Sequence, residues 1–221
     1  MQRYNDLSSY LKEKFGSRLL KLSIDGGFSC PNRKNGKSGC KFCSERGSGE
    51  FTTRRKSITE QLNAQINFLK DKDKYNGYIA YFQSYTNTFL PVEQLRKMYY
   101  EAINFPNVKV LSIATRADCF NEEIYNLLAE LNDKIEVWIE LGLQSSNENT
   151  RNNMNIGYST ETFENCVKRL KELNIKHKLI KPYTPRHNGK VERSHKKDQE
   201  RFYHNKVFFS FEDLVNRQNI I

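Results

Sequence analysis

Three cysteines, Cys30, Cys40 and Cys43, lie within fourteen residues of each other near the N-terminus of this chain. Nine residues separate the first from the second, and two separate the second from the third. The intervening residues are rich in Gly, Asn and Lys, so the segment is predicted to be a loop rather than a continuous helix or strand. Because cysteine thiolates bind zinc and iron, this loop is a candidate metal site.

The spacing leaves three alternatives for the loop. A structural zinc ion takes four Cys or His ligands in close-spaced pairs, but only one such pair is present, no histidine lies nearby, and Cys119 is the conceivable fourth ligand. A four-iron cluster on three thiolates instead leaves one iron open for a substrate or cofactor. The third alternative is unliganded thiols. The spacing favours the cluster, and we interpret Cys119 and Cys166 as structural residues.

Composition indicates a folded protein in a reducing compartment. The 221 residues are 37% apolar and 12% aromatic, enough for a core. No run of eighteen apolar residues and no N-terminal signal segment is present, so we expect a cytoplasmic protein without membrane association. Its cysteines are then reduced thiols, and a tight cysteine group there favours metal binding over disulfides.

Helical and strand patterns alternate along the first 175 residues. Strands are expected at 19–25, 77–83, 109–115, 135–141 and 175–181, and helices at 4–15, 57–69, 91–103, 121–131 and 160–173. Ser57 with Glu60 forms a capping box, Pro91 is expected at a first helical position, and Asn121 is an N-cap. This alternation predicts an α/β fold with a parallel sheet that curls into an open or closed barrel.

The polar segments follow the strands. They are residues 26–43, 83–88, 115–118 and 142–145, and they come after the first four expected strands in turn. Chemistry in such folds gathers at the carboxyl ends of the strands. We therefore expect these four segments to form one rim.

Six motifs in order resemble the radical S-adenosylmethionine (radical SAM) superfamily, and within it a bacterial family related to the elongator-subunit-type proteins. The motifs span about residues 3–172 and lie at 3–5, 25–33, 43–49, 81–88, 112–119 and 140–144. Phe42, directly before the last cysteine of the loop, also fits the superfamily pattern.

This resemblance implies a partial (β/α) barrel that binds a [4Fe-4S] cluster on Cys30, Cys40 and Cys43. S-adenosyl-L-methionine (SAM) would chelate the open iron. A one-electron reductant would then drive cleavage of SAM to methionine and a 5′-deoxyadenosyl radical, which abstracts hydrogen from a substrate that the sequence does not identify. The cofactors carry this chemistry, and the protein supplies position and shielding.

The resemblance also suggests SAM contacts. The residues implied along the methionyl part are Gln83, Ser84, Tyr85 and Thr86, and those near the ribose or adenine are Gln144 and Glu140. Plainer interpretations are that Glu140 caps a strand and that Thr115 and Arg116 order a turn. One departure affects SAM affinity: Ile156 stands where the family pattern has Arg.

The last 46 residues differ from the rest. Residues 176–221 contain eleven Lys and Arg against five Asp and Glu, together with all four histidines. The Pro-x-x-Asn-Gly-x-x-Glu pattern from Pro185 to Glu192 resembles the end of the catalytic core of insertion-sequence transposases and retroviral-type integrases. In those enzymes Glu192 would be the third of three metal-binding carboxylates. No RNase H-like sheet with the other two precedes it, so we expect weak, non-specific nucleic-acid binding at most.

These observations predict two parts of separate origin. Residues 1–175 are expected to be an incomplete radical SAM core, a truncated barrel without its substrate-selecting part, which would impair catalysis. Residues 176–221 are expected to be a basic, mainly helical transposase or integrase remnant from an RNase H-like fold. Two other functions stay open, a DNA-binding protein related to transposition and a non-functional chimeric gene remnant.

Overall fold

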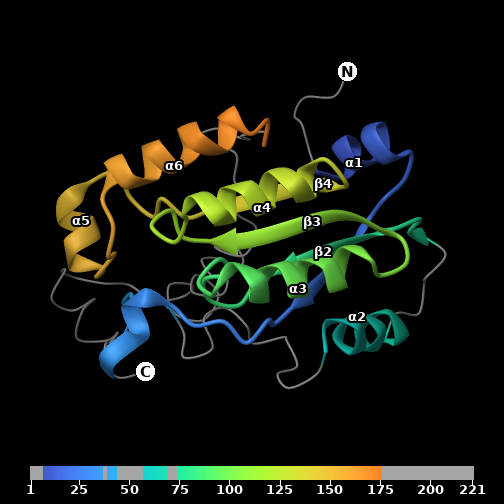
Figure 1. The fold of residues 1–221 in the computed structure, drawn as a ribbon, viewed down its shortest axis with the longest axis horizontal. Coiled ribbons are helices and arrows are strands. Elements are labelled where there is room, and N and C mark those ends of the chain that lie inside the picture. The colour runs from blue at the N-terminus through green and yellow to red at the C-terminus, as the bar shows by residue number, and fades with distance from the viewer. Residues whose placement is uncertain (1–6, 37–38, 44–56, 69–73, 176–221) are drawn as a thin grey trace, which may run out of the picture. The chain divides into compact units, whose positions relative to one another are not determined.

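The computed structural model describes residues 7–36, 39–43, 57–68 and 74–175. Within them, helices alternate with the strands of one sheet (Figure 1). The strands are β1 (Leu20–Ile24), β2 (Tyr78–Phe82), β3 (Val108–Thr115) and β4 (Glu136–Leu141). The α-helices are α1 (Leu7–Phe15), α2 (Ile58–Asn67), α3 (Val92–Ile103), α4 (Glu122–Asn132), α5 (Glu148–Asn153) and α6 (Thr160–Glu172), and a 3-10 helix spans Pro31–Gly36.

All four strands are parallel and follow the order β1-β2-β3-β4. The predicted α/β fold with a parallel sheet is therefore confirmed. Parallel strands end at the same edge of their sheet. In Figure 1 that edge faces left, toward the 3-10 helix and α5.

The helix starts follow the expected capping chemistry with one difference. Ser57 and Glu60 form the predicted capping box, and Asn121 accepts a hydrogen bond from the Ile124 amide, which confirms it as an N-cap. Pro91 is the N-cap of α3 rather than its first helical residue. The 3-10 helix and α5 were not predicted, because six residues are too few to show a helical period.

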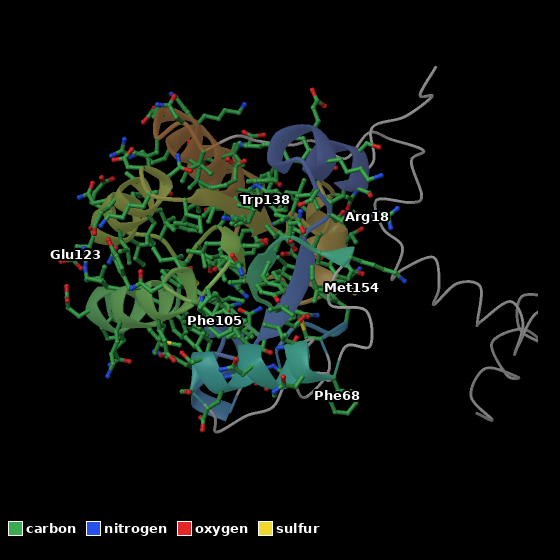
Figure 2. The ribbon with its side chains drawn as sticks, turned by 90° about the vertical axis from the view of Figure 1, so that its right-hand side faces the viewer. Arg18, Phe68, Phe105, Glu123, Trp138 and Met154 are labelled. Atoms are coloured by element: carbon green, nitrogen blue, oxygen red, sulfur yellow. The ribbon has the colours of Figure 1, made fainter. Side chains whose placement is uncertain are left out.

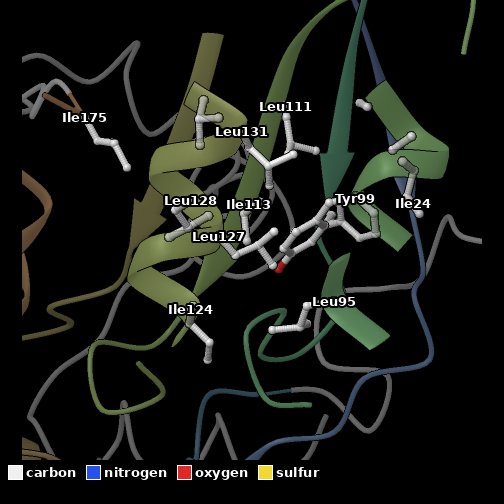
Figure 3. Packing of buried hydrophobic residues seen from close by; sticks show 14 of the residues in the cluster. Ile24, Leu95, Tyr99, Leu111, Ile113, Ile124, Leu127, Leu128, Leu131 and Ile175 are labelled. Carbon is white, nitrogen blue, oxygen red and sulfur yellow. The ribbon is translucent and has the colours of Figure 1, made fainter. Parts of the chain in front are cut away.

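The main core lies between one face of the sheet and helices α2, α3 and α4. That face carries two rows of register neighbours, Leu22, Ala80, Leu111 and Val137, then Ile24, Phe82, Ile113 and Ile139. Figure 3 shows Tyr99 of α3 in the middle of this cluster. Its ring is fully buried and packs edge-on to Phe82, and its hydroxyl donates to the backbone oxygen of Asn87. The core thereby fixes the position of the segment that follows β2.

A smaller cluster covers part of the other face. Leu11 of α1 packs with Leu19, Ile79 and Val110. Trp138 lies beside α1 (Figure 2), with its ring 6.2 Å from that of Tyr10. Toward the carboxyl edge, this face instead carries polar side chains, which belong to the candidate site described below.

Two glutamines of α2 hydrogen-bond to backbone N–H and C=O groups along the outer edge of β1. The Gln61 amide accepts from the Asp25 backbone nitrogen at 2.9 Å and donates to its oxygen at 2.9 Å. Gln65 makes the same pair of bonds to Ser23, at 2.8 and 2.7 Å. Unpaired backbone groups at a sheet edge invite pairing with other chains. Here α2 occupies them as an additional strand would.

Among the described residues, no helix is long and apolar enough to cross a membrane. Phe68, at the end of α2, projects from the fold and is 90% exposed (Figure 2). The expected strand at 175–181 and the whole tail from 176 to 221 lie outside the described residues apart from Ile175, which is buried in the main core.

Replacing Gln61 with Ala tests the role of α2 at the edge of β1. Gln61 is 3% exposed, and its loss removes its two hydrogen bonds to the buried backbone N–H and C=O of Asp25. We expect the free energy of unfolding in urea to fall by about 1–3 kcal/mol. The matched control is Gln94→Ala on the exposed side of α3. Equal stability of the two variants would contradict this role.

Candidate functional site

The cysteine loop begins directly after β1 and is shaped by short local bonds. Asp25, which is buried, accepts from the Gly27 amide at 2.8 Å, and Gly27 has a φ of 73°, in the left-handed region. The Cys30 backbone oxygen accepts from the Arg33 amide at 2.9 Å, and the Cys43 amide donates to the Cys40 oxygen at 3.0 Å. These turns place the three cysteines at the carboxyl edge of the sheet.

Nitrogen donors from the protein reach two of the three sulfurs. Asn32 Nδ2 donates to Cys40 Sγ at 3.2 Å, and Arg116 Nη1, from the segment after β3, donates to Cys30 Sγ at 3.6 Å. Arg33 Nη2 donates to the backbone oxygen of Cys43 at 3.1 Å. All three cysteines are partly exposed. The loop therefore presents accessible sulfurs beside two guanidinium groups.

These surroundings favour a thiolate at Cys40. Its pKa is lowered to about 6, mainly because the Cys43 thiol hydrogen-bonds to it, and further by the Asn32 bond and the charges of Arg116 and Arg33, against the effect of burial. The Cys43 pKa is raised, chiefly by the same bond to Cys40 and by burial, and the Cys30 charge adds to this. Thiolates are the form that binds metal.

A segment between α5 and α6 holds the cysteine loop in place. Asn32 Nδ2 donates to the Asn155 backbone oxygen at 2.7 Å, and Asn155 Nδ2 donates to the Gly39 oxygen at 2.7 Å. The Lys41 amide donates to the Met154 oxygen at 3.1 Å. A Cβ on Gly157 would lie 2.4 Å from Asn32 Oδ1, so only glycine allows this approach. Two segments more than a hundred residues apart are thereby joined.

The donor set of the loop is three partly exposed thiols. Within the described parts of the chain, no three His, Cys, Asp or Glu side chains are arranged to hold one metal ion. Cysteine thiolates are the ligand type of iron-sulfur clusters, in which each thiolate binds a different iron.

The other two cysteines lie in different surroundings. Cys119 and Cys166 are buried, and burial is the main cause that raises their pKa values, to about 12 and about 11. Cys166 belongs to the main core. Neither environment favours a thiolate, which agrees with a structural role.

The segment after β2 packs against the cysteine loop. Gln83, Ser84 and Thr86 are buried, and the Thr86 amide donates to the Ser29 backbone oxygen at 3.3 Å. Tyr85 is partly buried and has a φ of 60°, an uncommon left-handed conformation for a tyrosine. The structure therefore brings this predicted SAM-contact segment next to the predicted cluster ligands.

Glu140 lies on the polar part of the sheet face opposite the main core. Its carboxylate accepts from Lys21 Nζ at 2.8 Å, the Tyr81 hydroxyl at 2.9 Å and Ser112 Oγ at 3.2 Å. One donor comes from each of the other three strands. Burial and the Glu140 charge raise the pKa of Tyr81, so its hydroxyl remains a donor. On the outer strand β1, Ser23 Oγ donates to Gln83 Oε1 at 3.1 Å.

Gln144 is exposed and takes a left-handed conformation with a φ of 68°. Its amide nitrogen would lie 2.1 Å from a Cβ on Gly142, so the side chain folds back over that glycine. Arg151, which is 1% exposed, orders the same segment by donating to the backbone oxygens of Leu143 at 2.9 Å and Ser145 at 2.8 Å.

Several residues of the site were not predicted from the sequence. They are Asn32, Arg33, Arg151, Asn155 and Gly157, and Arg116 was interpreted only as ordering a turn. Asn32 and Arg116 lie inside motifs that resemble the superfamily, so the sequence could have indicated them as site residues. Asn155 and Gly157 act through contacts with a distant loop, and no local pattern indicates that partner. Ile156, at the position where the family pattern has Arg, is buried.

The parallel sheet and the thiol loop at its carboxyl edge define an α/β protein built to hold a cofactor. The family model of the radical SAM superfamily matches residues 28–191, and the chain belongs to that superfamily. A second model, that of the integrase core domain, matches residues 173–219. The two matched ranges overlap between residues 173 and 191.

Curated relatives match most of this chain. It is 39% identical to YtqA, an uncharacterized protein of Bacillus subtilis (strain 168), over 178 residues that cover 79% of this chain and 55% of YtqA. The protein YhcC of Escherichia coli (strain K12) is 36% identical over 169 residues, which cover 75% and 54% of the two chains. An uncharacterized protein of Methanocaldococcus jannaschii is 34% identical over 171 residues, 76% and 52% of the two chains. The chain spans about half the length of these relatives.

Alkylation of the metal-free protein tests the cysteine environments. At pH 7 we expect iodoacetamide to modify Cys40 faster than Cys119 or Cys166, because the thiolate is the nucleophile and only Cys40 has a lowered pKa among these three. The rate at Cys40 should rise as pH increases through about 6. Peptide mass spectrometry measures each site, with Cys40→Ser to confirm the assignment. Faster modification of Cys119 would contradict the interpretation.

Proposed function

We propose that this chain binds a [4Fe-4S] cluster on Cys30, Cys40 and Cys43 and uses it with SAM in radical chemistry. The observation that carries the proposal is the set of three accessible thiols at the carboxyl edge of the sheet, with nitrogen donors on Cys30 and Cys40. Membership of the radical SAM superfamily supports it. The six ordered motifs further support a place near the elongator-subunit-type proteins within that superfamily.

When bound, the reduced cluster supplies one electron that cleaves SAM to methionine and a 5′-deoxyadenosyl radical, which abstracts hydrogen from a substrate. The residues of this chain provide position and charge. The thiolates of Cys30, Cys40 and Cys43 would hold the cluster, and a one-electron reductant is the implied partner.

We infer that SAM lies along two segments of the same edge. Gln83, Ser84, Tyr85 and Thr86 are assigned to its methionyl part, which is supported by the contact between Thr86 and Ser29 at the start of the cysteine loop. Glu140 and Gln144 are assigned to the ribose or adenine. The Glu140 side chain is 44% exposed on the polar sheet face and keeps an accessible carboxylate, which supports this assignment.

Anaerobic reconstitution with iron and sulfide tests the cluster. We expect about four irons and four sulfides per chain, an EPR signal after reduction with dithionite, and a change of that signal on adding SAM. Cys30→Ala, Cys40→Ala and Cys43→Ala should each lose most of the iron. The matched controls Cys119→Ala and Cys166→Ala remove thiols outside the site and should keep it.

A wild-type chain that takes up zinc but no iron would overturn the cluster assignment. A chain that takes up neither metal would favour the non-functional gene remnant. If the cluster forms but SAM leaves the EPR signal unchanged, the cluster assignment stands and the SAM assignment fails.

We propose as a second function that residues 176–221 bind nucleic acid weakly and without sequence preference. The match to the integrase core domain and the excess of basic residues support this, and they support a separate origin for residues 1–175 and 176–221. Strand transfer is not proposed, because a two-metal site needs further carboxylates beside Glu192, and the residues before it match the radical SAM superfamily.

Salt-dependent binding to a fluorescent DNA duplex tests this second function. Replacing Lys190, Arg193, Lys196 and Lys197 with Gln should weaken binding at low salt and flatten the dependence of log K on log salt, since each lost phosphate contact reduces the slope by about 0.9. The matched control replaces four exposed lysines of the described part, Lys12, Lys97, Lys109 and Lys168. Equal weakening by both sets would show that net charge, not the tail, is responsible.

A further inference from the structure

We propose that Arg116 and Asp118 set the reduction potential of the cluster, with Arg116 raising it and Asp118 limiting that increase. This inference rests on the proposed function, since it requires a cluster on Cys30, Cys40 and Cys43. It concerns two residues of this chain that would bind no iron and act through charge and hydrogen bonding at one thiolate. Arg116 and Asp118 are therefore positioning residues, which act on the cluster through Cys30.

The Arg116 guanidinium lies between two negative groups. Its Nη1 donates to Cys30 Sγ at 3.6 Å. Its Nε and Nη2 donate to Asp118 Oδ1 and Oδ2 at 2.9 and 2.8 Å, a two-point carboxylate pair. Such pairs fix the plane of the guanidinium as well as its charge. One positive charge is therefore shared between a cluster ligand and a carboxylate.

Neighbouring groups limit the movement of this guanidinium. The Tyr158 ring lies with its centre 5.1 Å from Arg116 Cζ. A Cβ on Gly157 would lie 3.2 Å from Arg116 Nη2, so the backbone approaches closely on that side. The Arg116 side chain is 12% exposed and that of Asp118 is 22% exposed. Because the Arg116 guanidinium is largely buried, its charge acts on Cys30 with less screening than a fully exposed charge would, whereas Asp118 stays in contact with water.

The direction of the effect follows from charge. One electron from an external reductant adds one negative charge beside Cys30. The Arg116 charge and its N–H bond stabilise the more negative state, which raises the reduction potential. The Asp118 carboxylate offsets part of that positive charge. Removing Arg116 should thus lower the potential, and removing the Asp118 charge should raise it.

Arg116 acts on a different cysteine from the other described donors. Cys40 Sγ receives a neutral donor from Asn32, and Arg33 donates to the backbone oxygen of Cys43. Arg116 brings a formal positive charge to a sulfur, that of Cys30, through a hydrogen bond. A charge change at Arg116 should therefore shift the potential.

Potentiometric titration of the reconstituted full chain tests the proposal. Wild type, Arg116→Gln and Asp118→Asn are first loaded anaerobically and assayed for iron and sulfide. Each is then titrated with dithionite without SAM, and the EPR signal of the reduced cluster gives the fraction reduced. One electron enters each cluster. We expect the equilibrium constant for reduction to fall at least tenfold in Arg116→Gln and to rise at least tenfold in Asp118→Asn, about 59 mV each for a one-electron couple.

Two controls separate this effect from a structural one. Arg116→Lys keeps the charge and should restore part of the potential lost in Arg116→Gln. Arg96→Gln removes one positive charge from a pair with Glu130 that joins α3 to α4, and it should leave the potential unchanged. A purely structural role would shift Arg116→Gln and Asp118→Asn in the same direction or reduce their iron content alike.

The outcomes also separate this proposal from the cluster assignment. A wild-type chain that binds no iron would remove the basis of both. A loaded wild type whose two variants keep its potential, or shift it in the same direction, would overturn only the roles of Arg116 and Asp118. If Arg116→Gln does not retain the cluster, Asp118→Asn decides alone, because it leaves Arg116 and all three thiols in place.

Discussion

The parallel alignment of the four strands is the constraint on which the rest of this structure depends. It brings the ends of β1, β2 and β3 to one edge, so that Cys30, Thr86 and Arg116, widely separated in sequence, become neighbours. The alignment itself depends on burial of the apolar rows of the sheet under α2, α3 and α4. Burial of apolar side chains thus fixes the positions of polar residues that contribute little to the apolar core.

The cysteine loop does not define its own geometry. Its short turns bring Cys40 and Cys43 together, but Asn32 is held by Asn155, and the close approach depends on Gly157. The contact between the cysteine loop and the segment that follows α5 consists of hydrogen bonds rather than packed apolar side chains. Such a contact holds the loop against a distant segment through bonds that each contribute only modestly to stability.

The superfamily match includes the segments that the sheet brings to its carboxyl edge. The family match covers residues 28–191, while the curated relatives extend to about twice the matched length. In the described chain β1 and β4 are the outer strands, and α2 satisfies the free edge of β1 through Gln61 and Gln65. Glu140 on β4 accepts hydrogen bonds from side chains on the other three strands, so these bonds extend across the width of the polar sheet face.

The sequence by itself determined the four described strands, the described α-helices other than α5, and the parallel class of the sheet, and it identified the three thiols of the candidate site. Hydrophobic period and caps such as Ser57 and Asn121 are local properties, and the cysteine spacing is a property of one loop. Three contacts appear only in the tertiary structure. They are the hydrogen bond from Arg116 to Cys30, the approach of Asn155 and Gly157 to the cysteine loop, and the bonds between α2 and the edge of β1. The physical reason is that these contacts join residues far apart in the chain. Their geometry depends on how the strands align, which no local pattern encodes.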